Sequence, residues 1–247
     1  MYAGGPSEAP KIDPAVASYV SDGAAWKNLL PGPGMKGWRE PTGDWQMVGQ
    51  VVLDPADAKK LAVEPGVGTI YNGPKGRTRN LFTAEAFGDV VAHIEFMVPK
   101  ESNSGVYFMG RYEVQVFDSF DKTGAYPGIE CGGIYQRWDP KRGKGKEGFE
   151  GHSPRVNASR PPGQWQTFDV VFRAPRFDAA GKKIANARFV KIVHNGTVVH
   201  ENVEVTGPTR GAAFSDEQAS GPLMFQGDHG PVAYRRIAIV PIASNDE

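Results

Sequence analysis

The chain has 247 residues, 40% of them hydrophobic, which is enough to bury a sizeable core, and all-β sandwiches of this length commonly form one domain. Its 28 Lys and Arg residues balance its 28 Asp and Glu residues, so no global field draws it to nucleic acid or to an anionic membrane, and we expect a neutral or weakly charged partner. The 31 glycines and 20 prolines interrupt the chain too often for long helices and indicate many strands.

Missing sequence features exclude two further classes of protein. No run of 18 or more apolar residues occurs, so no transmembrane helix is expected. Cys131 is the only cysteine, which excludes an internal disulfide and a Cys-rich zinc site, and we predict a buried or half-buried structural residue. The start, MYAGGPSEAP, lacks the basic residues and apolar stretch of a signal peptide, so we expect that any export signal is absent from this chain.

The first 25 residues differ in composition from the remainder of the chain. Residues 1–25 contain Gly, Pro and Ala with no sustained period, which predicts a tail or a wrapping arm, and we expect the main domain over residues 26–247. Strand-like runs then recur, with few helices between them. These runs cover residues 45–53, 89–99, 103–110, 111–118, 165–175, 188–195, 197–205, 223–227 and 232–242. The sequence therefore predicts an all-β fold.

Two connections between these runs are informative. HNGT, residues 194–197, places Asn195-Gly196 between two strand patterns, and this pair supplies the positive φ angles of a tight hairpin turn.

From residue 119 to 163 the strand pattern stops, and a loop of this length in a compact domain is either functional or poorly ordered. We interpret its basic stretch, residues 141–146, as a solvated tip, and GAYPG and IYQRW as a wall beside a site.

Alternation along the 89–99 run separates a core face from a polar face, because successive side chains of a strand point to opposite sides of the sheet. One set is apolar throughout: Val90, Ala92, Ile94, Phe96 and Val98. The opposite set is Val91, His93, Glu95 and Met97. We expect the first set to face the core, with Ile192 and Ile239 among the residues that pack there.

The same alternation in YEVQVFD places Tyr112, Val114 and Val116 in the core and leaves Glu113, Gln115 and Phe117 opposite. Strict alternation puts Asp118 on the core side, unless a bulge near Phe117 returns it to the polar face. The polar set is either the wet face of a sandwich or a sugar site, in which carboxylates and amides bind hydroxyls and an aromatic ring stacks on the sugar. The absence of Lys from both stretches favours the sugar site.

Other candidates lie at strand ends. Asn103 opens a strand after a turn, and FQGDHG places Gln226, Asp228 and His229 at a strand end and its turn; each is either turn chemistry or a rim of ligand donors. His152 and His194 are interpreted as loop or hairpin residues. No motif indicates a dedicated transition-metal or calcium site, although the Glu, Asp, Gln and His residues together would allow a weakly bound divalent cation.

Several stretches together resemble the 3-keto-disaccharide hydrolase family. They are AHIEFMVPKESNSGVYFMGRYEVQVFDS, TGAYPG, RPPGQWQTFDVVF, VHNGTVV and GPLMFQGDHGPVAYRRIAIVPI. The resemblance as a whole runs in consistent order from about Trp38 to Ile242. The resemblance implies a concanavalin A-like jelly roll of two antiparallel sheets, export to the periplasm or outside a bacterial cell, and action on glycosides whose C3 hydroxyl is oxidised to a ketone. The insertion YQRWDPKRGKGKEGFEGHSPRV departs from the family pattern and leaves the aglycone open.

The resemblance also implies residue roles. Concanavalin-like glycosidases carry catalytic carboxylates on one strand at a similar i, i+2, i+5 spacing, and EVQVFD is similar with Gln115 in place of the middle acid. A 3-keto sugar permits proton abstraction at C2, elimination of the C1 leaving group and hydration. Glu113, Asp118 and Gln115 are then the expected catalytic residues. The expected substrate-binding residues are Glu95, Asn103, Arg111, Trp138, Gln226 and His229, with Arg111 or His229 stabilising the enolate.

Two other functions are compatible with the same residues. A carbohydrate-binding module needs only an aromatic side chain and a few amides on such a sandwich, and an exported structural domain needs no site at all. An enzyme requires Glu95, Glu113 and Asp118 to converge, and we expect Glu113, Gln115 and Glu95 to line one concave face covered at one end by the 119–163 loop.

Overall fold

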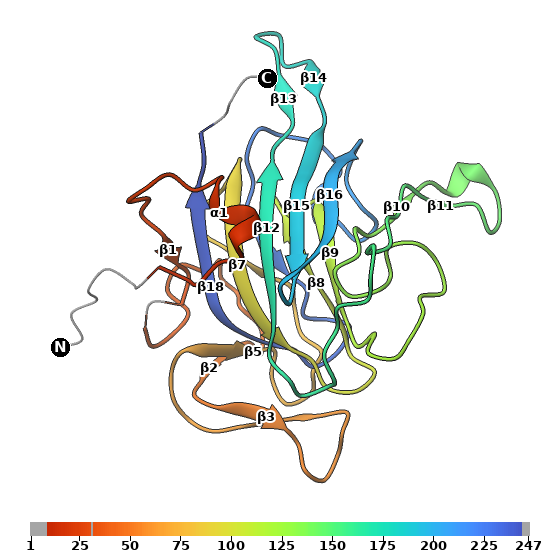
Figure 1. The fold of residues 1–247 in the computed structure, drawn as a ribbon. Coiled ribbons are helices and arrows are strands. Elements are labelled where there is room, and N and C mark those ends of the chain that lie inside the picture. Colours follow the sequence, from red (N-terminus) through yellow and green to blue (C-terminus); the bar gives the residue numbers. More distant parts are fainter. Residues whose placement is uncertain (1–8, 31, 244–247) are drawn as a thin grey trace.

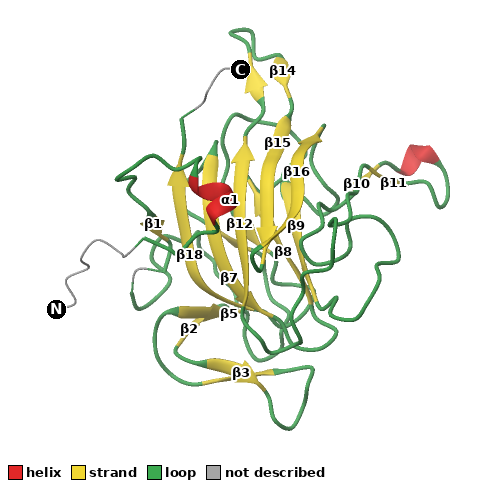
Figure 2. Ribbon diagram, viewed as in Figure 1, coloured by secondary structure: helices red, strands yellow, loops and turns green. Residues whose placement is uncertain are grey.

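Two antiparallel β-sheets packed face to face form the body of the protein (Figure 1). The structure is a computed structural model and describes residues 9–30 and 32–243. Strands dominate, and helices are confined to α1 (Pro14–Ala17) and the short 3-10 helix η1 (Pro140–Arg142) within the described residues (Figure 2). The all-β prediction and the two-sheet jelly roll are confirmed.

The larger sheet has the strand order β16-β15-β12-β7-β18-β5-β2, and β1 pairs with β18. Its strands are β1 (Lys27–Asn28), β2 (Gln46–Val48), β5 (Thr69–Tyr71), β7 (Val90–Met97), β12 (Gln166–Arg173), β15 (Ala187–His194), β16 (Thr197–Val205) and β18 (Ala233–Pro241). The smaller sheet has the order β6-β17-β8-β9. Its strands are β6 (Leu81–Phe82), β8 (Asn103–Phe108), β9 (Tyr112–Phe117) and β17 (Met224–Phe225).

Three two-stranded ribbons project from this body. They are β3 (Val51–Leu53) with β4 (Leu61–Val63), β10 (Arg137–Trp138) with β11 (Gly148–Phe149), and β13 (Arg176–Phe177) with β14 (Lys183–Ala185). The β10–β11 ribbon lies in the long loop after β9 and reaches away from the sandwich with η1 at its tip (Figure 1). The loop predicted over residues 119–163 therefore contains a hairpin, whose basic tip is exposed.

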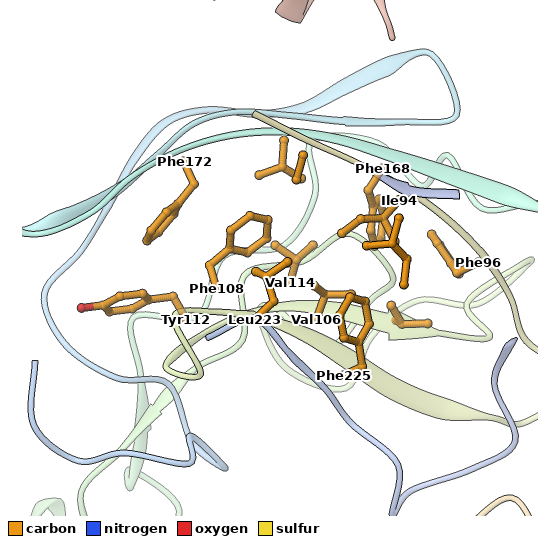
Figure 3. Packing of buried hydrophobic residues seen from close by; sticks show 14 of the residues in the cluster. Ile94, Phe96, Val106, Phe108, Tyr112, Val114, Phe168, Phe172, Leu223 and Phe225 are labelled. Carbon is orange, nitrogen blue, oxygen red and sulfur yellow. The ribbon is translucent and has the colours of Figure 1, made fainter. Parts of the chain in front are cut away.

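The core fills the space between the two sheets, where large apolar side chains from both layers point toward one another (Figure 3). Every core residue predicted from alternation is fully buried: Ile94, Phe96, Val114, Val116, Ile192 and Ile239. Aromatic pairs add contacts across it, such as Phe108 against Phe172 with ring centroids 5.1 Å apart. Each such side chain stabilises the fold by about 1.5 to 3 kcal/mol through the apolar area it removes from water.

Most of the predicted strands are found close to their expected bounds. The hairpin at Asn195-Gly196 is confirmed, with φ angles of 50° and 80°, and it pairs β15 with β16. The run predicted over residues 45–53 is divided, since β2 joins the large sheet whereas β3 pairs with β4. The short strand β5 was not predicted, because three residues flanked by glycine and asparagine give too little alternation to recognise.

The described part of the N-terminal segment crosses the outer face of the large sheet. Asp13 caps α1 by accepting a hydrogen bond from the Ala15 amide (2.8 Å), and Pro14 at the first helical position has the φ angle that a helix requires. Val16 is fully buried against valines of four strands, Val91, Val171, Val193 and Val240. The arm thus covers apolar side chains that this face would otherwise expose. Among the described residues, no helix has the length and apolarity needed to cross a membrane.

We predict that Val116→Asp prevents stable folding. Val116 is fully buried between the sheets, and a carboxylate there has no partner, so the free energy of unfolding should fall by more than about 4 kcal/mol. Val156→Asp is the matched control, because Val156 is 48% exposed and its change should stay within about 0.5 kcal/mol. Chemical denaturation followed by circular dichroism measures both. A Val116→Asp variant as stable as the control would contradict the assigned core face.

Candidate active site

The candidate site lies on the outer face of the small sheet, the side that points away from the core. Strand β8 directs Asn103, Gly105 and Tyr107 to this face, because Val106 and Phe108 between and beyond them enter the core. The paired register sets Gly105 opposite Gln115 and Tyr107 opposite Glu113. Side chains from two adjacent strands are therefore neighbours here as a consequence of alternation alone.

Glu113 lies over the backbone of β8. A Cβ atom on Gly105 would clash with the Glu113 carboxyl group, so a larger residue there would displace this side chain from its position. In the amide orientation that satisfies its polar atoms, Gln115 donates from Nε2 to Glu113 Oε1 (3.0 Å) and to the Ser104 carbonyl (3.3 Å), and its oxygen lies 3.2 Å from the Asn103 side chain. The predicted grouping of Glu113, Gln115 and Asn103 is what the structure contains.

The carboxyl group of Glu113 is buried without a cation beside it. The residue is 2% exposed, and Oε2 has no hydrogen-bond partner among the described residues. Burial raises the pKa of Glu113 to about 8, because the ionised form loses its hydration; the Tyr107 hydroxyl opposes this shift, and the negative charge of Asp228 adds to it. A carboxyl group with a pKa near neutrality can both accept and return a proton.

Polar groups from the turn after β17 border the same place. Gln226 Nε2 lies 3.5 Å from the Tyr107 hydroxyl, and burial raises the pKa of Tyr107 well above its ordinary value. Asp228 and His229 form an exposed pair in which Asp228 Oδ1 lies 2.6 Å from His229 Nδ1. The structure thus places the predicted Gln226 beside the Glu113 group, with the Asp228–His229 pair in the same turn.

The long loop after β9 covers the free edge of the small sheet. The Tyr135 amide donates to the Glu113 carbonyl (3.1 Å), and the Gln115 amide donates to the Gly133 carbonyl (2.8 Å). Tyr135 hydrogen-bonds Tyr126 through their hydroxyl groups (2.7 Å). These hydrogen bonds satisfy backbone groups that an edge strand would otherwise expose. They also hold the loop that contains GAYPG and IYQRW, the segments predicted to form a wall beside the site, against β9.

Trp138 lies farther along this loop, at the base of the β10–β11 ribbon. One ring face is covered by the Arg210 guanidinium, 3.8 Å from the ring centroid, and the residue remains 41% exposed. Arg210 follows Thr209, whose hydroxyl accepts a hydrogen bond from the Glu113 amide (3.2 Å). Trp138 is therefore linked to the Glu113 strand through a short chain of contacts.

Asp118 is not brought to Glu113, so the predicted pair of carboxylates on one strand is wrong. Strand β9 ends at Phe117, and the Asp118 carboxylate accepts the Glu101 amide (2.8 Å) and the Lys122 ammonium (2.6 Å). No bulge returns the side chain to the polar face. Asp118 instead fastens the turn between β7 and β8 to the end of β9.

Arg111 is likewise separated from the site. Its guanidinium donates to the Asp216 carboxylate (3.0 Å) and to the Met109 carbonyl (2.8 Å), and it stacks on Phe214. All of these partners belong to the turn before β9 or to the loop before β17. A guanidinium held by these contacts anchors that loop and does not reach an enolate beside Glu113.

Glu95 lies on the other side of the molecule, so the expectation that Glu95 and Glu113 line one face is wrong. Both residues point away from the core, but Glu95 is on β7 of the large sheet and Glu113 on β9 of the small sheet. The full thickness of the sandwich separates them. Glu95 accepts a hydrogen bond from Arg235 Nε (2.6 Å), and its surroundings are those of an ion-pair cluster.

Sequence reasoning did not single out Tyr107 or Tyr135. Tyr107 had a usable signal, because it lies four residues after Asn103 on the same strand face and follows Gly105 by two. Tyr135 lies in IYQRW, which was predicted only as part of a wall, because the position of its side chain depends on how an irregular loop meets the edge of β9. The buried state predicted for Cys131 is confirmed. Among the described residues, no three His, Cys, Asp or Glu side chains are grouped to hold a metal ion.

Comparison with known proteins identifies the family. A family model described as "3-keto-alpha-glucoside-1,2-lyase-like domain" matches residues 25–240, and the chain belongs to this family. Membership places the protein among glycoside-acting, enzyme-like proteins with a carbohydrate partner. Comparison with curated proteins gives no match.

Solved structures share the fold. One protein from Parabacteroides distasonis ATCC 8503, described as a "putative glycosyl hydrolase", is 24% identical, has a TM-score of 0.62, and is matched over 88% of this chain and 84% of its own. A second protein of the same organism and description is 15% identical, with a TM-score of 0.56 and coverage of 88% and 99%. At these identities the likeness concerns the jelly-roll fold.

We predict that the stability of the protein depends on pH through Glu113. The folded pKa is about 8 and the ordinary value is 4.5, so the stabilisation due to the protonated carboxyl is complete below about pH 4.5 and is lost as pH rises to 8. Glu113→Gln removes this loss. The variant should gain roughly 2 to 5 kcal/mol on wild type between pH 5 and 8, measured by urea unfolding at several pH values. A difference that stays constant with pH would refute the buried, neutral carboxyl.

Proposed function

We propose that this member of the 3-keto-alpha-glucoside-1,2-lyase-like family cleaves 3-keto-glycosides, with Glu113 as the group that moves the proton at C2. The single observation that carries the proposal is a carboxyl group buried on the small sheet, held by Gln115, with one oxygen unpartnered among the described residues and its pKa raised to about 8. Classical retaining hydrolysis with Asp118 as the second carboxyl is disfavoured, because it requires the two carboxyls to lie about 5 to 5.5 Å apart and Asp118 is held by Lys122 and the Glu101 amide.

The chemistry follows from the ketone at C3. The ketone acidifies the C2 proton, so Glu113 can take that proton while the electron pair of the C2–H bond forms a C2=C3 double bond and the π pair of the carbonyl moves to the C3 oxygen, giving an enolate. The enolate then re-forms the ketone, the C1=C2 double bond forms, and the C1–O bond breaks with its electron pair on the departing oxygen. Addition of water places hydroxide at C1 and returns a proton to C2. The sum is cleavage of the glycoside by water.

The neighbouring groups suit the other requirements of this sequence. The Tyr107 hydroxyl stays protonated because burial raises its pKa, so it can donate a hydrogen bond to the enolate oxygen. The Asp228–His229 pair, exposed in the turn after β17, can protonate the departing oxygen. Asn103 and Gln226 offer amide groups to sugar hydroxyls, and the exposed ring of Trp138 offers a stacking surface to the aglycone.

Burial of Glu113 makes access to it part of the proposal. With only 2% of the residue exposed, a substrate reaches its carboxyl only if a covering segment moves. We assign this movement to the loop that carries Tyr126 and Tyr135, since its Tyr135 amide is bonded to the Glu113 carbonyl, a contact that opening of the loop would break. Loop closure over bound sugar would also exclude water during proton transfer.

The second candidate function is carbohydrate binding without catalysis. Two observations favour it: Glu95, Glu113 and Asp118 do not converge, contrary to what was expected of an enzyme, and Trp138 presents an exposed aromatic ring whereas the Glu113 carboxyl is buried. A binding module needs the ring and amides alone. The two functions differ in one measurable respect, because only the enzyme releases the aglycone.

We predict that the protein cleaves 3-keto-glucosides far faster than matched unoxidised glucosides. Glu113→Gln keeps the shape and hydrogen bonding of the side chain but cannot accept a proton, so kcat should fall about 10² to 10⁴-fold with binding largely kept. Aglycone release and sugar binding are measured for both variants. Glu204→Gln, on the exposed end of β16, is the control and should retain wild-type rates.

Solvent D₂O distinguishes the route. Elimination and hydration place deuterium at C2 of the released sugar, whereas direct hydrolysis places none there. Turnover of the ordinary glucoside that is as fast as, or faster than, turnover of the 3-keto-glucoside would contradict the proposed substrate. Binding of sugar with no turnover of either substrate would favour the binding module.

We predict that Tyr107→Phe moves the pH dependence of catalysis. If ionised Glu113 is the base, kcat/KM rises with pH and levels off above about pH 8. The Tyr107 hydroxyl lowers the pKa of Glu113, so its removal should raise that pKa and shift the rising limb to higher pH. The measurement is kcat/KM from pH 5 to 10 for wild type and variant. An unshifted limb with a uniformly lower rate would show that Tyr107 acts only by binding.

A further inference from the structure

A second charged cluster lies on the outer face of the large sheet, on the side of the sandwich opposite Glu113. A hollow of about 560 Å³ opens there, within the size range of small-molecule sites. Pro10 of the N-terminal arm and Asn28 of β1 line it, together with Glu95, Arg235 and Arg236. We propose that this hollow binds an oxyanion, the carboxylate of an acidic sugar or a phosphate group, through Arg235 and Arg236.

An irregularity in β18 places both arginines beside the same carboxylate. Arg235 is opposite Glu95 and Ile237 is opposite Ile94, so Arg236 is an extra residue with no partner of its own on β7. Its φ angle is 47°, a left-handed conformation that a side chain other than glycine adopts at a cost. Regular alternation would have directed the Arg236 side chain to the core side of the sheet. The bulge instead gives the hollow two adjacent guanidinium groups.

Three basic side chains surround Glu95, and only one of them makes a short hydrogen bond to it. Arg235 Nε donates to Oε2 at 2.6 Å, but His93 Nε2 and Arg236 Nε lie 3.5 and 3.8 Å from Oε1. Both of these distances are at or beyond the limit of a good hydrogen bond. Among the described residues, the Arg236 guanidinium makes no hydrogen bond. It is therefore available for a ligand.

The cluster carries a net positive charge. Its acids are Asp169 and Glu95, and its bases are Arg235, Arg236 and His93, whose Nδ1 lies 2.6 Å from Asp169 Oδ1. Despite desolvation, the hydrogen bond to Asp169 and the nearby negative charge of Glu95 raise the pKa of His93 to about 9, so the ring is protonated at pH 7. Three positive and two negative groups leave a charge of +1, which one anionic group would neutralise.

Arg235 is held in place before any ligand arrives. Arg235 lies between the Glu95 carboxylate and the Trp165 ring, 4.1 Å from its centroid. Its side chain remains 43% exposed and that of Arg236 44% exposed. Planar guanidinium groups bind carboxylates and phosphates with paired hydrogen bonds, and prior ordering lowers the entropic cost of forming them. A carboxylate or phosphate is thus the ligand group that this geometry fits.

Titration of the labelled protein by NMR at pH 7 and low salt tests the site. The probes are glucuronate, inorganic phosphate and glucose. Glucuronate or phosphate should shift resonances of Glu95, Arg235 and Arg236 saturably with a Kd on the order of millimolar, whereas glucose should not. The relative affinity of the two anions identifies the source of the oxyanion.

Variants show whether the arginines are responsible. Arg236→Gln removes the charge but keeps a long polar side chain, and should weaken anion binding at least about tenfold. Arg188→Ala is the control, because Arg188 lies on the same sheet but pairs with Glu204 outside the hollow, and anion binding should be unchanged. Absence of saturable shifts up to about 50 mM of either anion, or unaltered binding in Arg236→Gln, would overturn the proposal. Both variants should cleave keto-glucoside at the wild-type rate. The test of anion binding is therefore independent of the test of catalysis by Glu113.

Discussion

Close packing of apolar side chains between two sheets is the constraint on which the rest of the molecule depends. Ile94 and Phe96 from β7 meet Val106 and Val114 from the small sheet, and all four are fully buried (Figure 3). Because alternate residues must enter this space, the residues between them must leave it, on one side of the sandwich or the other. The packing therefore determines which polar side chains can meet, and it keeps those of the two sheets apart.

Two glutamates show how the surroundings decide the chemistry of one functional group. Glu113 is buried beside the loop after β9 and forms no ion pair among the described residues, so desolvation dominates and its pKa rises to about 8. Glu95, half-buried on the opposite face, has Arg235 and His93 beside it, and these cations outweigh desolvation and lower the pKa of its carboxyl. One carboxyl is suited to transfer protons, and the other remains a fixed negative charge.

Places where regular strand pairing is interrupted position polar side chains that regular strands alone would not. The loop after β9 satisfies the backbone of that edge strand and brings Tyr135 beside Glu113. The bulge in β18 turns Arg236 toward the same carboxylate as Arg235. In both places an irregular backbone positions polar side chains that alternation would have sent elsewhere. Such positions are common at binding and catalytic sites.

The sequence by itself determined which residues share a strand face, since alternation is a local property. It identified the core valines of β9, the neighbouring Glu113 and Gln115, and the turn at Asn195-Gly196. It could not decide that Glu95 and Glu113 lie on opposite sides, because that depends on which sheet each strand joins. It also could not predict that Arg111 pairs with Asp216, which is 105 residues away. Contacts between segments that are distant in the sequence form only when the whole chain packs, because their stability depends on how all the elements are arranged. Only the tertiary structure therefore shows them.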